Sequence, residues 1–287
     1  MPSPATDSPA SACLVAAVQM NSGNDRDANL AAAGRLLEAA AQRGARVAVL
    51  PENFSIMAQR DADRRALAEA DGAGPVQDFL ARTAASLEMW IVAGSVPLAN
   101  GIGERIAQAC LVYAANGTRA ARYDKIHLFD VELPDGAETY RESAHMAPGN
   151  TVVTVDTPAG RLGLSICYDL RFPELYRRLQ AAGAQWFVVP AAFTVPTGEA
   201  HWQPLLRARA IENLCYVVAS AQCGVHPSGR RTYGHSLIFD YWGRMLTELP
   251  EGEGVVTAVL DVAAQSEARR KFPALSHRVE LLQELGP

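Results

Sequence analysis

The sequence predicts an α/β fold in which buried strands alternate with helices, and three observations support this. Apolar runs of strand length recur along the whole 287-residue chain. Many of these runs stop abruptly at proline, glycine or a turn-forming cluster. Segments with apolar residues at helical spacing separate several of the runs. This order of elements builds a sheet with helices packed on its faces.

The N-terminal half opens as a strand–helix–strand unit. Residues 11–20 form an apolar run that is typical of a buried strand, and the helical pattern that follows closes at Gly44. The next apolar run ends at Pro51. We expect helices over 26–44 and 74–88, and strands over 11–20, 46–52, 89–99 and 106–117.

The second half repeats this alternation after a long irregular stretch. Residues 129–150 lack periodicity, and a loop of that length inside a compact domain is usually functional or disordered. A hairpin then follows, whose second strand is expected to end at Cys167. The expected elements are a hairpin over 152–167, helices over 172–184 and 201–217, and strands over 185–193, 216–224, 235–246 and 254–261.

Composition places the chain among soluble globular proteins. Hydrophobic residues make up 49% and charged residues 20% of the chain, and the net charge of −5 argues against a nucleic-acid partner. No apolar stretch is long enough to predict a membrane span. Residues 1–10 are rich in Pro, Ser and Ala and predict a disordered tail, so residues 11–287 are expected to form a single domain.

Cysteine usage indicates a reducing compartment. The five cysteines are widely spaced, with no C-x-x-C pair and no Cys/His cluster of the metal-binding kind. Reduced thiols in a cytoplasmic protein are the simplest interpretation. We therefore expect a cytoplasmic location, no bound metal and no cofactor.

Three polar residues stand where predicted strands end, and they are the candidates for chemistry. Glu52 lies just beyond Pro51, at the strand end where α/β sheets usually bind ligands. Lys125 precedes the long loop and could stabilise an oxyanion. Cys167 lies at a strand-to-helix elbow, where the field of the helix N-terminus favours the thiolate. Taken singly, a loop carboxylate, a surface lysine and a small buried thiol are the commoner interpretations.

A cysteine nucleophile needs a base, and histidine is an alternative to Glu52. His127, His201 and His235 are the histidines that stand out. A papain-like Cys–His pair would use one of them, but no segment matches the local signatures of that class. His201 opens a helix and His235 follows a glycine in a strand, so both are more simply structural.

Together the three candidates resemble the Glu–Lys–Cys triad of the nitrilase (carbon–nitrogen hydrolase) superfamily. The segments PENF, KIHLFD and CYDLRFPELYR contain Glu52, Lys125 and Cys167 in the same order as in the family. The resemblance extends over residues 13–280. It implies a four-layer α-β-β-α sandwich and an amidase that forms a thioester without a metal.

The resemblance also implies roles for neighbouring residues. Glu142, in YRES ahead of a Pro-Gly pair, matches a second glutamate that positions the lysine and the substrate. Glu138 is nearby but lacks this context. In the implied mechanism Glu52 is the general base, while Lys125 and the backbone N–H of Tyr168 donate to the oxyanion. Lysine would lower the pKa of Glu52 and burial would raise it, and the sequence does not decide between them.

A carboxylate on the substrate would need a cation near the nucleophile. Arg171 is four residues beyond Cys167 on the same elbow, and its guanidinium offers two parallel hydrogen bonds to a carboxylate. A solvent-facing arginine at a helix start is the alternative. Thr194, just beyond a predicted strand, is the expected neutral partner for the same group.

Several short segments resemble one branch of the superfamily more closely. PAAFTVPTGEAHW, LLRARAIEN, ASAQCG and TYGHSLIFDYWG look like those of the deaminated glutathione amidases, and the ω-amidases that act on α-ketoglutaramate share much of this pattern. The implied reaction hydrolyses the ω-amide of a 2-oxo acid with release of ammonia, and the resemblance implies deaminated glutathione as the first expected substrate and α-ketoglutaramate as the second. A nitrilase, an N-carbamoyl amino acid hydrolase and a non-catalytic binding protein on the same fold are the alternatives.

Members of the superfamily generally associate through a helix face. The predicted helices over 172–184 and 201–217 mix arginine with apolar residues, which suits an interface with an apolar centre and a charged rim. We therefore expect a homodimer or homotetramer whose other partner is a small-molecule amide.

Overall fold

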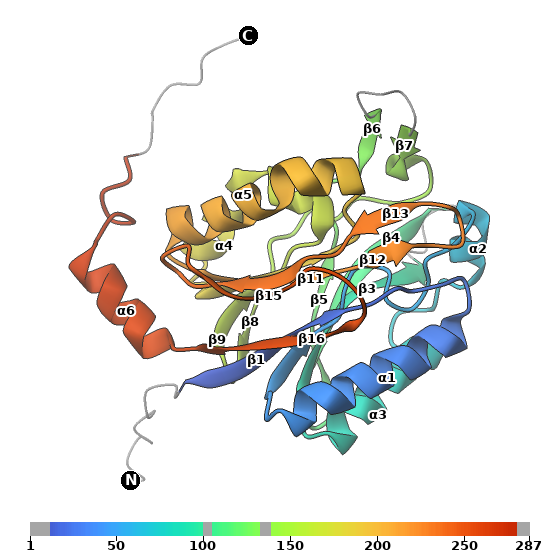
Figure 1. The fold of residues 1–287 in the computed structure, drawn as a ribbon, viewed down its shortest axis with the longest axis horizontal. Helices are drawn as coiled ribbons and strands as arrows, with labels where there is room; N and C mark the ends of the chain where they lie inside the picture. The colour runs from blue at the N-terminus through green and yellow to red at the C-terminus, as the bar shows by residue number, and fades with distance from the viewer. Residues whose placement is uncertain (1–11, 100–104, 133–138, 280–287) are drawn as a thin grey trace.

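Two six-stranded sheets form the centre of the protein in the computed structural model, which describes residues 12–99, 105–132 and 139–279 (Figure 1). In the first sheet the three central strands β1, β2 and β3 are parallel, and antiparallel strands flank them. The order across this sheet is β16 (Gly254–Leu260), β1 (Cys13–Gln19), β2 (Val47–Val49), β3 (Trp90–Ala99), β4 (Ile106–Tyr113) and β5 (Arg119–Asp124).

The second sheet has the same plan, since β9, β10 and β11 run parallel at its centre with antiparallel strands on both sides. Its order is β15 (Met245–Leu249), β14 (Ser236–Phe239), β11 (Tyr216–Ala221), β10 (Trp186–Ala191), β9 (Gly160–Gly163) and β8 (Thr154–Thr157). The alternation of strands and helices in each half of the sequence therefore corresponds to one sheet for each half, except that β16 returns to the first.

Helices cover the outer face of each sheet. Helices α1 (Arg26–Gln42) and α3 (Pro75–Ser86) pack on the first sheet, and α4 (Pro173–Ala181) and α5 (Val195–Asn213) pack on the second (Figure 1). The two sheets face each other between these helix layers. This is the expected four-layer α-β-β-α sandwich.

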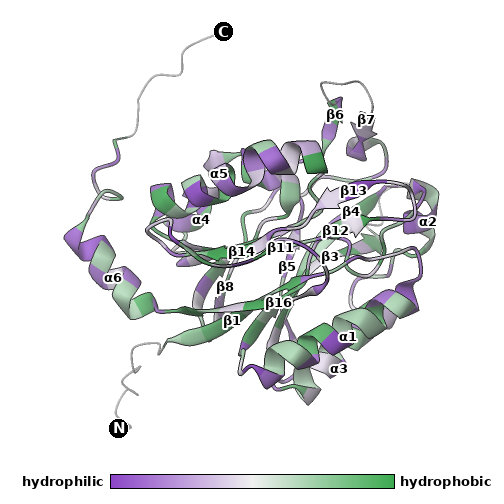
Figure 2. Ribbon diagram, in the orientation of Figure 1, coloured by the Kyte–Doolittle hydropathy of each residue, from purple (hydrophilic) through white to green (hydrophobic). Residues whose placement is uncertain are grey.

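The strand pattern explains why the central strands read as uninterrupted apolar runs. Along β1, Val15 and Ala17 belong to the core that continues through the second sheet, whereas Ala16 and Val18 belong to the core under α1 and α3. A strand that is covered on both faces has no position for a solvated side chain. Figure 2 accordingly shows apolar residues along the strands and on the inward faces of the helices.

The structure departs from the predicted elements near Cys167. The second strand of the 152–167 hairpin ends at Gly163, and Cys167 begins a short 3-10 helix, η2 (Cys167–Arg171), that leads into α4. The Ile166 N–H is bonded to the Asp169 carboxylate at 2.8 Å. Because a side chain takes this donor, the apolar segment does not continue as a strand up to the cysteine.

Several short or polar elements were not expected from the sequence. The predicted helix over 201–217 begins earlier, at Val195, and ends at Asn213. The long stretch over 129–150 contains β6 and β7 in its described part. The strand expected over 216–224 is divided between β11 and β12 (Cys223–Val225), and the one expected over 235–246 between β14 and β15. Elements that were not expected are β5, β6 (Asp130–Glu132), β7 (Thr139–Arg141), η1 (Glu142–Ala144), α2 (Asp61–Ala66), β13 (Arg231–Tyr233) and α6 (Val262–Lys271).

The remaining sequence expectations concern the tail, the thiols and the membrane. The predicted disordered tail over 1–10 lies outside the described residues. All five cysteines are buried and free. Within residues 12–99, 105–132 and 139–279, no helix is both long enough and apolar enough to cross a bilayer.

Candidate active site

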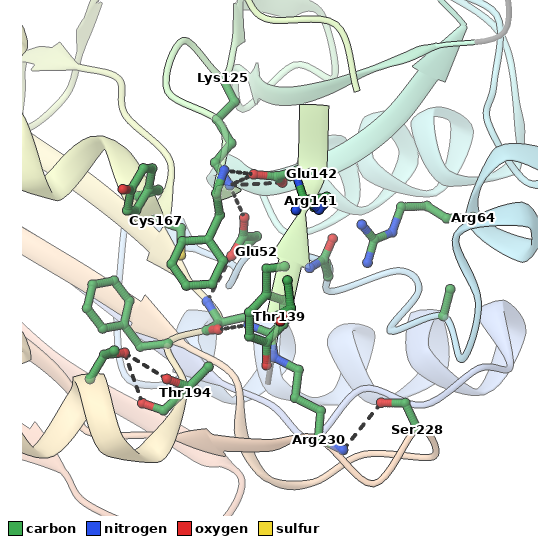
Figure 3. Close-up of a pocket in the computed structure, with 18 of the residues that line it drawn as sticks. Glu52, Arg64, Lys125, Thr139, Arg141, Glu142, Cys167, Thr194, Ser228 and Arg230 are labelled. Atoms are coloured by element: carbon green, nitrogen blue, oxygen red, sulfur yellow. Dashed lines mark hydrogen bonds and ion pairs between the residues drawn. The ribbon is translucent and has the colours of Figure 1, made fainter. Parts of the chain in front are cut away.

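A pocket of about 610 Å³ lies where strand ends from the two sheets meet, and it brings together all the site residues that the sequence singled out (Figure 3). These residues come from segments far apart in the chain. They are Glu52, Lys125, Glu142, Cys167, Tyr168, Arg171 and Thr194.

Glu52 enters the pocket from the segment that follows β2. This segment passes close to β3 at Gly94, where an added Cβ would lie 2.2 Å from the Leu50 carbonyl oxygen. Only glycine permits this approach. The Glu52 side chain is 5% exposed, and its Oε2 accepts a hydrogen bond from the Ala192 N–H at 2.9 Å. The first sheet therefore supplies the carboxylate and the second sheet holds it in place.

Lys125 follows β5, and the chain that comes back from the long loop holds it there. The Gly149 N–H donates to the Lys125 carbonyl at 2.8 Å. A Cβ on Gly149 would lie 2.2 Å from the carbonyl oxygen of Asp124, so the glycine of the Pro-Gly pair is needed for this close contact. The side chain that results is 2% exposed.

The Lys125 ammonium lies between two carboxylates (Figure 3). Its Nζ is 3.0 Å from Glu52 Oε1, and 3.0 and 2.9 Å from the two oxygens of Glu142. Glu142 also accepts a hydrogen bond from the Phe129 N–H at 2.7 Å. Glu52 and Lys125 are thus buried and Glu142 is partly buried, with the hydrogen bonds of all three made, which is the condition for keeping charges out of water.

Cys167 projects from a strained elbow. Its φ of 48° lies in the left-handed region of backbone conformation, which residues other than glycine seldom adopt. Asp169 stabilises the elbow, because its buried carboxylate accepts from Ile166 N and from the Tyr123 hydroxyl at 2.7 Å. The same carboxylate accepts from the backbone N–H of His127 at 3.1 Å. Asp169 therefore ties the nucleophile elbow to the segment that carries Lys125.

The electrostatics of the cluster favour a neutral thiol beside an ionised base. Burial, together with the negative charge of Glu52, raises the pKa of the Cys167 thiol well above its ordinary value. Burial also acts to raise the pKa of Glu52. The Lys125 charge and hydrogen bonds from Cys167 and Lys125 outweigh that effect, so this pKa lies below its ordinary value. The expected stabilisation of a thiolate by a helix N-terminus is therefore wrong for the resting site.

Lys125 stays charged in this environment. Burial alone would lower its pKa, but the Glu142 and Glu52 carboxylates reverse this and raise the pKa. The raised pKa of Cys167 and the charge of Lys125 thus place a neutral thiol near a cation. Lys125 remains available as a cationic donor throughout.

The rim of the pocket near the elbow carries the groups predicted for the substrate. The Arg171 guanidinium lies over the rings of Tyr168 and Phe193, at 5.9 and 5.6 Å from their centroids. Its Nη1 is 3.3 Å from Nδ1 of His201. Thr194 is 2% exposed, and its hydroxyl lies 2.8 Å from that of Thr197. Each of these residues retains part of its hydrogen-bonding capacity for a ligand.

The histidines occupy other places. His127 stacks on Phe172 with ring centroids 3.7 Å apart, and its Nδ1 is 2.7 Å from Asp169. His235 Nδ1 is 2.7 Å from Glu248. None of the histidines in the described part of the chain lines the pocket with Cys167, so a papain-like Cys–His pair is ruled out by geometry.

Three functional features had no sequence signal. Arg64, from α2, and Arg230, from the loop between β12 and β13, both line the pocket. The Ala192 N–H, just beyond β10 of the second sheet, bonds Glu52, which follows β2 of the first sheet. Among the residues that the structure describes, no group of three His, Cys, Asp or Glu side chains could hold a metal ion.

The chain is similar to known enzymes over nearly its whole length. Residues 14–270 match the carbon-nitrogen hydrolase family. The chain is 44% identical to the deaminated glutathione amidase of Synechocystis sp. over 271 residues, which cover 93% of this chain and 98% of the relative. It is 40% identical to the deaminated glutathione amidase of Yersinia enterocolitica over 264 residues, or 92% of each chain.

A solved structure agrees with this similarity. Nit3 of Saccharomyces cerevisiae, described as a member of branch 10 of the nitrilase superfamily, matches with a TM-score of 0.83 and 29% identity, covering 97% of this chain and 99% of Nit3. The buried Glu–Lys–Cys cluster lies at the strand ends of the same fold. The protein is therefore a member of the carbon–nitrogen hydrolase family within the nitrilase superfamily, and a hydrolase of carbon–nitrogen bonds.

Proposed function

We propose that this enzyme hydrolyses the ω-amide of deaminated glutathione through a thioester on Cys167. The observation that carries this proposal is that Cys167 and the buried Glu52 carboxylate line one pocket, with the Lys125 ammonium 3.0 Å from that carboxylate. The relatives from Synechocystis and Yersinia, which bear the name deaminated glutathione amidase, support the choice of substrate.

In the acylation step Glu52 takes the thiol proton as Cys167 Sγ bonds to the amide carbon. The carbonyl oxygen becomes an oxyanion, and the Lys125 ammonium and the backbone N–H of Tyr168 stabilise it. Each such donor stabilises the transition state by about 3 kcal/mol. Glu52 then gives its proton to the leaving nitrogen as the carbon–nitrogen bond breaks, which leaves an acyl thioester.

In the deacylation step Glu52 acts again as a base. It takes a proton from water, the hydroxyl bonds to the thioester carbon, and the proton returns to the departing sulfur. Glu142 keeps Lys125 aimed at the oxyanion in both steps. No group beyond these side chains and water is needed to balance the reaction.

The chemistry of the substrate decides the leaving group. Glutathione is a γ-glutamyl-cysteinyl-glycine tripeptide, so cleavage of the γ-amide in its deaminated form releases cysteinylglycine and a five-carbon 2-oxo diacid. The expected release of ammonia therefore applies to primary ω-amides such as α-ketoglutaramate. We assign Arg171 and Thr194 to the carboxylate of the 2-oxo acid part, which both substrates share.

The proposal is tested by incubating the purified protein with deaminated glutathione and, separately, with α-ketoglutaramate. Cysteinylglycine is quantified in the first reaction and ammonia in the second, for wild type and Cys167→Ala. The expected result is dipeptide release that disappears in the variant, with a higher kcat/KM for deaminated glutathione. A higher kcat/KM for α-ketoglutaramate would make the enzyme an ω-amidase, and no release from either substrate would refute the proposal.

We also propose that the enzyme acts in the cytoplasm as a homodimer or homotetramer. Support for the location comes from the five free, buried cysteines. Support for assembly comes from α4 and α5, which contact each other through Arg177 and Glu212 on the outer face of the second sheet. The mass in solution, measured by light scattering, tests the assembly.

A further inference from the structure

Two arginines of the pocket have nitrogen atoms that are buried and unbonded. Arg64 Nε and Arg230 Nε are shielded from solvent, and neither has a hydrogen-bond partner. Burying such a donor unpaired is costly, and natural proteins keep few of them. These donors therefore suggest a ligand that is bound during function.

The charges of these two arginines are also not neutralised. Across residues 12–99, 105–132 and 139–279, no ion pair includes Arg64 or Arg230. Arg230 donates an Nη2 bond to the Ala192 carbonyl and lies over the ring of Tyr140, 5.0 Å from its centroid. Both carboxylates that line the pocket are already bonded to Lys125. This wall of the pocket therefore presents net positive charge to a ligand.

The two arginines lie apart from Arg171. Arg171 is on the same elbow as Cys167, whereas Arg64 reaches in from α2 and Arg230 from the loop between β12 and β13. In Figure 3, Arg64 points into the pocket from the side of Glu142 and Glu52 opposite to Cys167. Arg64 therefore lies across the reacting cluster from Cys167, whose elbow carries Arg171.

Deaminated glutathione has two carboxylates at opposite ends. One belongs to the 2-oxo acid part and is assigned to Arg171. The other terminates the glycine of the leaving dipeptide, and two residues reach about 7 Å beyond the scissile nitrogen. A primary ω-amide such as α-ketoglutaramate has no group that extends in this direction.

From these observations we infer that Arg64 and Arg230 form a subsite for the terminal carboxylate of the leaving group. This inference rests on the proposed function and gives it a physical basis for choosing a dipeptide amide over a primary amide. A guanidinium binds a carboxylate through two parallel hydrogen bonds, so the two arginines that line this wall are suitable partners. Arg64 is the cleaner residue to test, because Arg230 also contacts Ala192, whose N–H bonds Glu52.

The experiment combines one substrate change with one protein change. The values of kcat/KM are measured for deaminated glutathione, for its glycinamide analogue and for α-ketoglutaramate, with wild type, Arg64→Met and Arg65→Met. Arg65 lies on the same helix and does not line the pocket, which makes it a matched control. In wild type, amidation of the glycine carboxylate is expected to lower kcat/KM about 10- to 100-fold, since a charged hydrogen-bond pair is lost.

The kcat/KM of Arg64→Met for deaminated glutathione is expected to fall by the same factor, about 10- to 100-fold. The kcat/KM of this variant for the glycinamide analogue and for α-ketoglutaramate should change little. Arg65→Met should have wild-type kcat/KM values for all three substrates. An equal loss on all three with Arg64→Met would mean a structural role and would overturn the inference. Wild-type turnover of deaminated glutathione that is insensitive to amidation would overturn the inference alone. No wild-type turnover of that substrate would refute the proposed function and the inference together.

Discussion

Two charged regions of the same pocket differ in whether their charges are paired. Around Lys125, the ammonium and the Glu52 carboxylate are buried and the Glu142 carboxylate is partly buried, and all three have their hydrogen bonds made within the protein. Arg64 and Arg230 form another wall of the pocket, and the Nε atom of each has no hydrogen-bond partner. None of the ion pairs among the described residues includes either arginine. Paired charges are held rigidly and can tune proton transfer, whereas unpaired cations are available to bind a substrate. The proposed function accordingly assigns the reaction to the paired charges and substrate recognition to the unpaired cations.

Breaking the paired region should have the largest effect. Lys125→Met leaves Glu52 and Glu142 buried without a cation, so we expect a loss of about 10³-fold in kcat and of about 3–5 kcal/mol in the free energy of unfolding. Denaturant titration and steady-state kinetics measure the two effects. The double variant Lys125→Met/Glu142→Gln should regain part of the stability but none of the activity. Recovery of activity in the double variant would contradict the role of Lys125.

Removing a recognition cation should affect binding rather than chemistry. Arg171→Ala is expected to raise KM for ω-amide acids about 10- to 100-fold because it removes a charged pair with the substrate carboxylate. The value of kcat should change much less, and the unfolding midpoint should stay near that of wild type. An unchanged KM, measured with the same substrate, would remove Arg171 from the carboxylate site.

A milder change in the paired region is Glu142→Gln. The amide keeps an oxygen for the Phe129 N–H but carries no charge to hold Lys125. We expect kcat to fall about 10-fold, within the range for misplaced catalytic groups, with little change in KM. A larger rise in KM than fall in kcat would assign Glu142 to substrate binding instead.

The smallest expected effect is on pH dependence. Glu52 must be ionised to act as the base, and its pKa lies below the ordinary value of 4.5. The kcat/KM of wild type should therefore stay level as pH falls from 7 to that value and decline only below it. The stability contributed by ionised Glu52 follows the same direction and is lost as pH falls through the lowered pKa.

Removing Lys125 should shift the pKa of Glu52 in the opposite direction. In Lys125→Met the chief cause that lowers the Glu52 pKa is gone and burial remains, so the acid limb of the residual activity should move to higher pH. Pre-steady-state acylation rates between pH 4 and 8 would measure this. A limb that stays in place would indicate that another group titrates.

The fold and the residues that meet in the pocket could be predicted from the sequence because both leave local signals. Strands buried on two faces read as unbroken apolar runs, and Glu52, Lys125 and Cys167 each lie in a distinctive segment at a strand end. The confirmed four layers follow from these runs and from the helices between them. The Pro-Gly pair is another local signal. Its Gly149 packs against the Asp124 carbonyl oxygen, where a side chain would clash.

The remaining features arise only in three dimensions. The thiol pKa depends on burial and on the Glu52 charge, which a segment far away in the chain supplies. Arg64 and Arg230 lie in segments without any motif, and tertiary packing alone brings them to the pocket. The hairpin strand ends early because the Asp169 carboxylate takes the Ile166 N–H, a side-chain contact that periodicity does not record.

The most direct test of the account is to trap the thioester on Cys167. Wild type and Cys167→Ala would each be mixed with deaminated glutathione, quenched in acid within one turnover, and examined by intact-protein and peptide mass spectrometry. The account predicts that wild type gains the mass of the 2-oxo acyl group on the peptide that contains Cys167, together with one equivalent of cysteinylglycine, and that the variant gains neither. Release of cysteinylglycine by Cys167→Ala, or an acyl group on a different residue, would contradict the account.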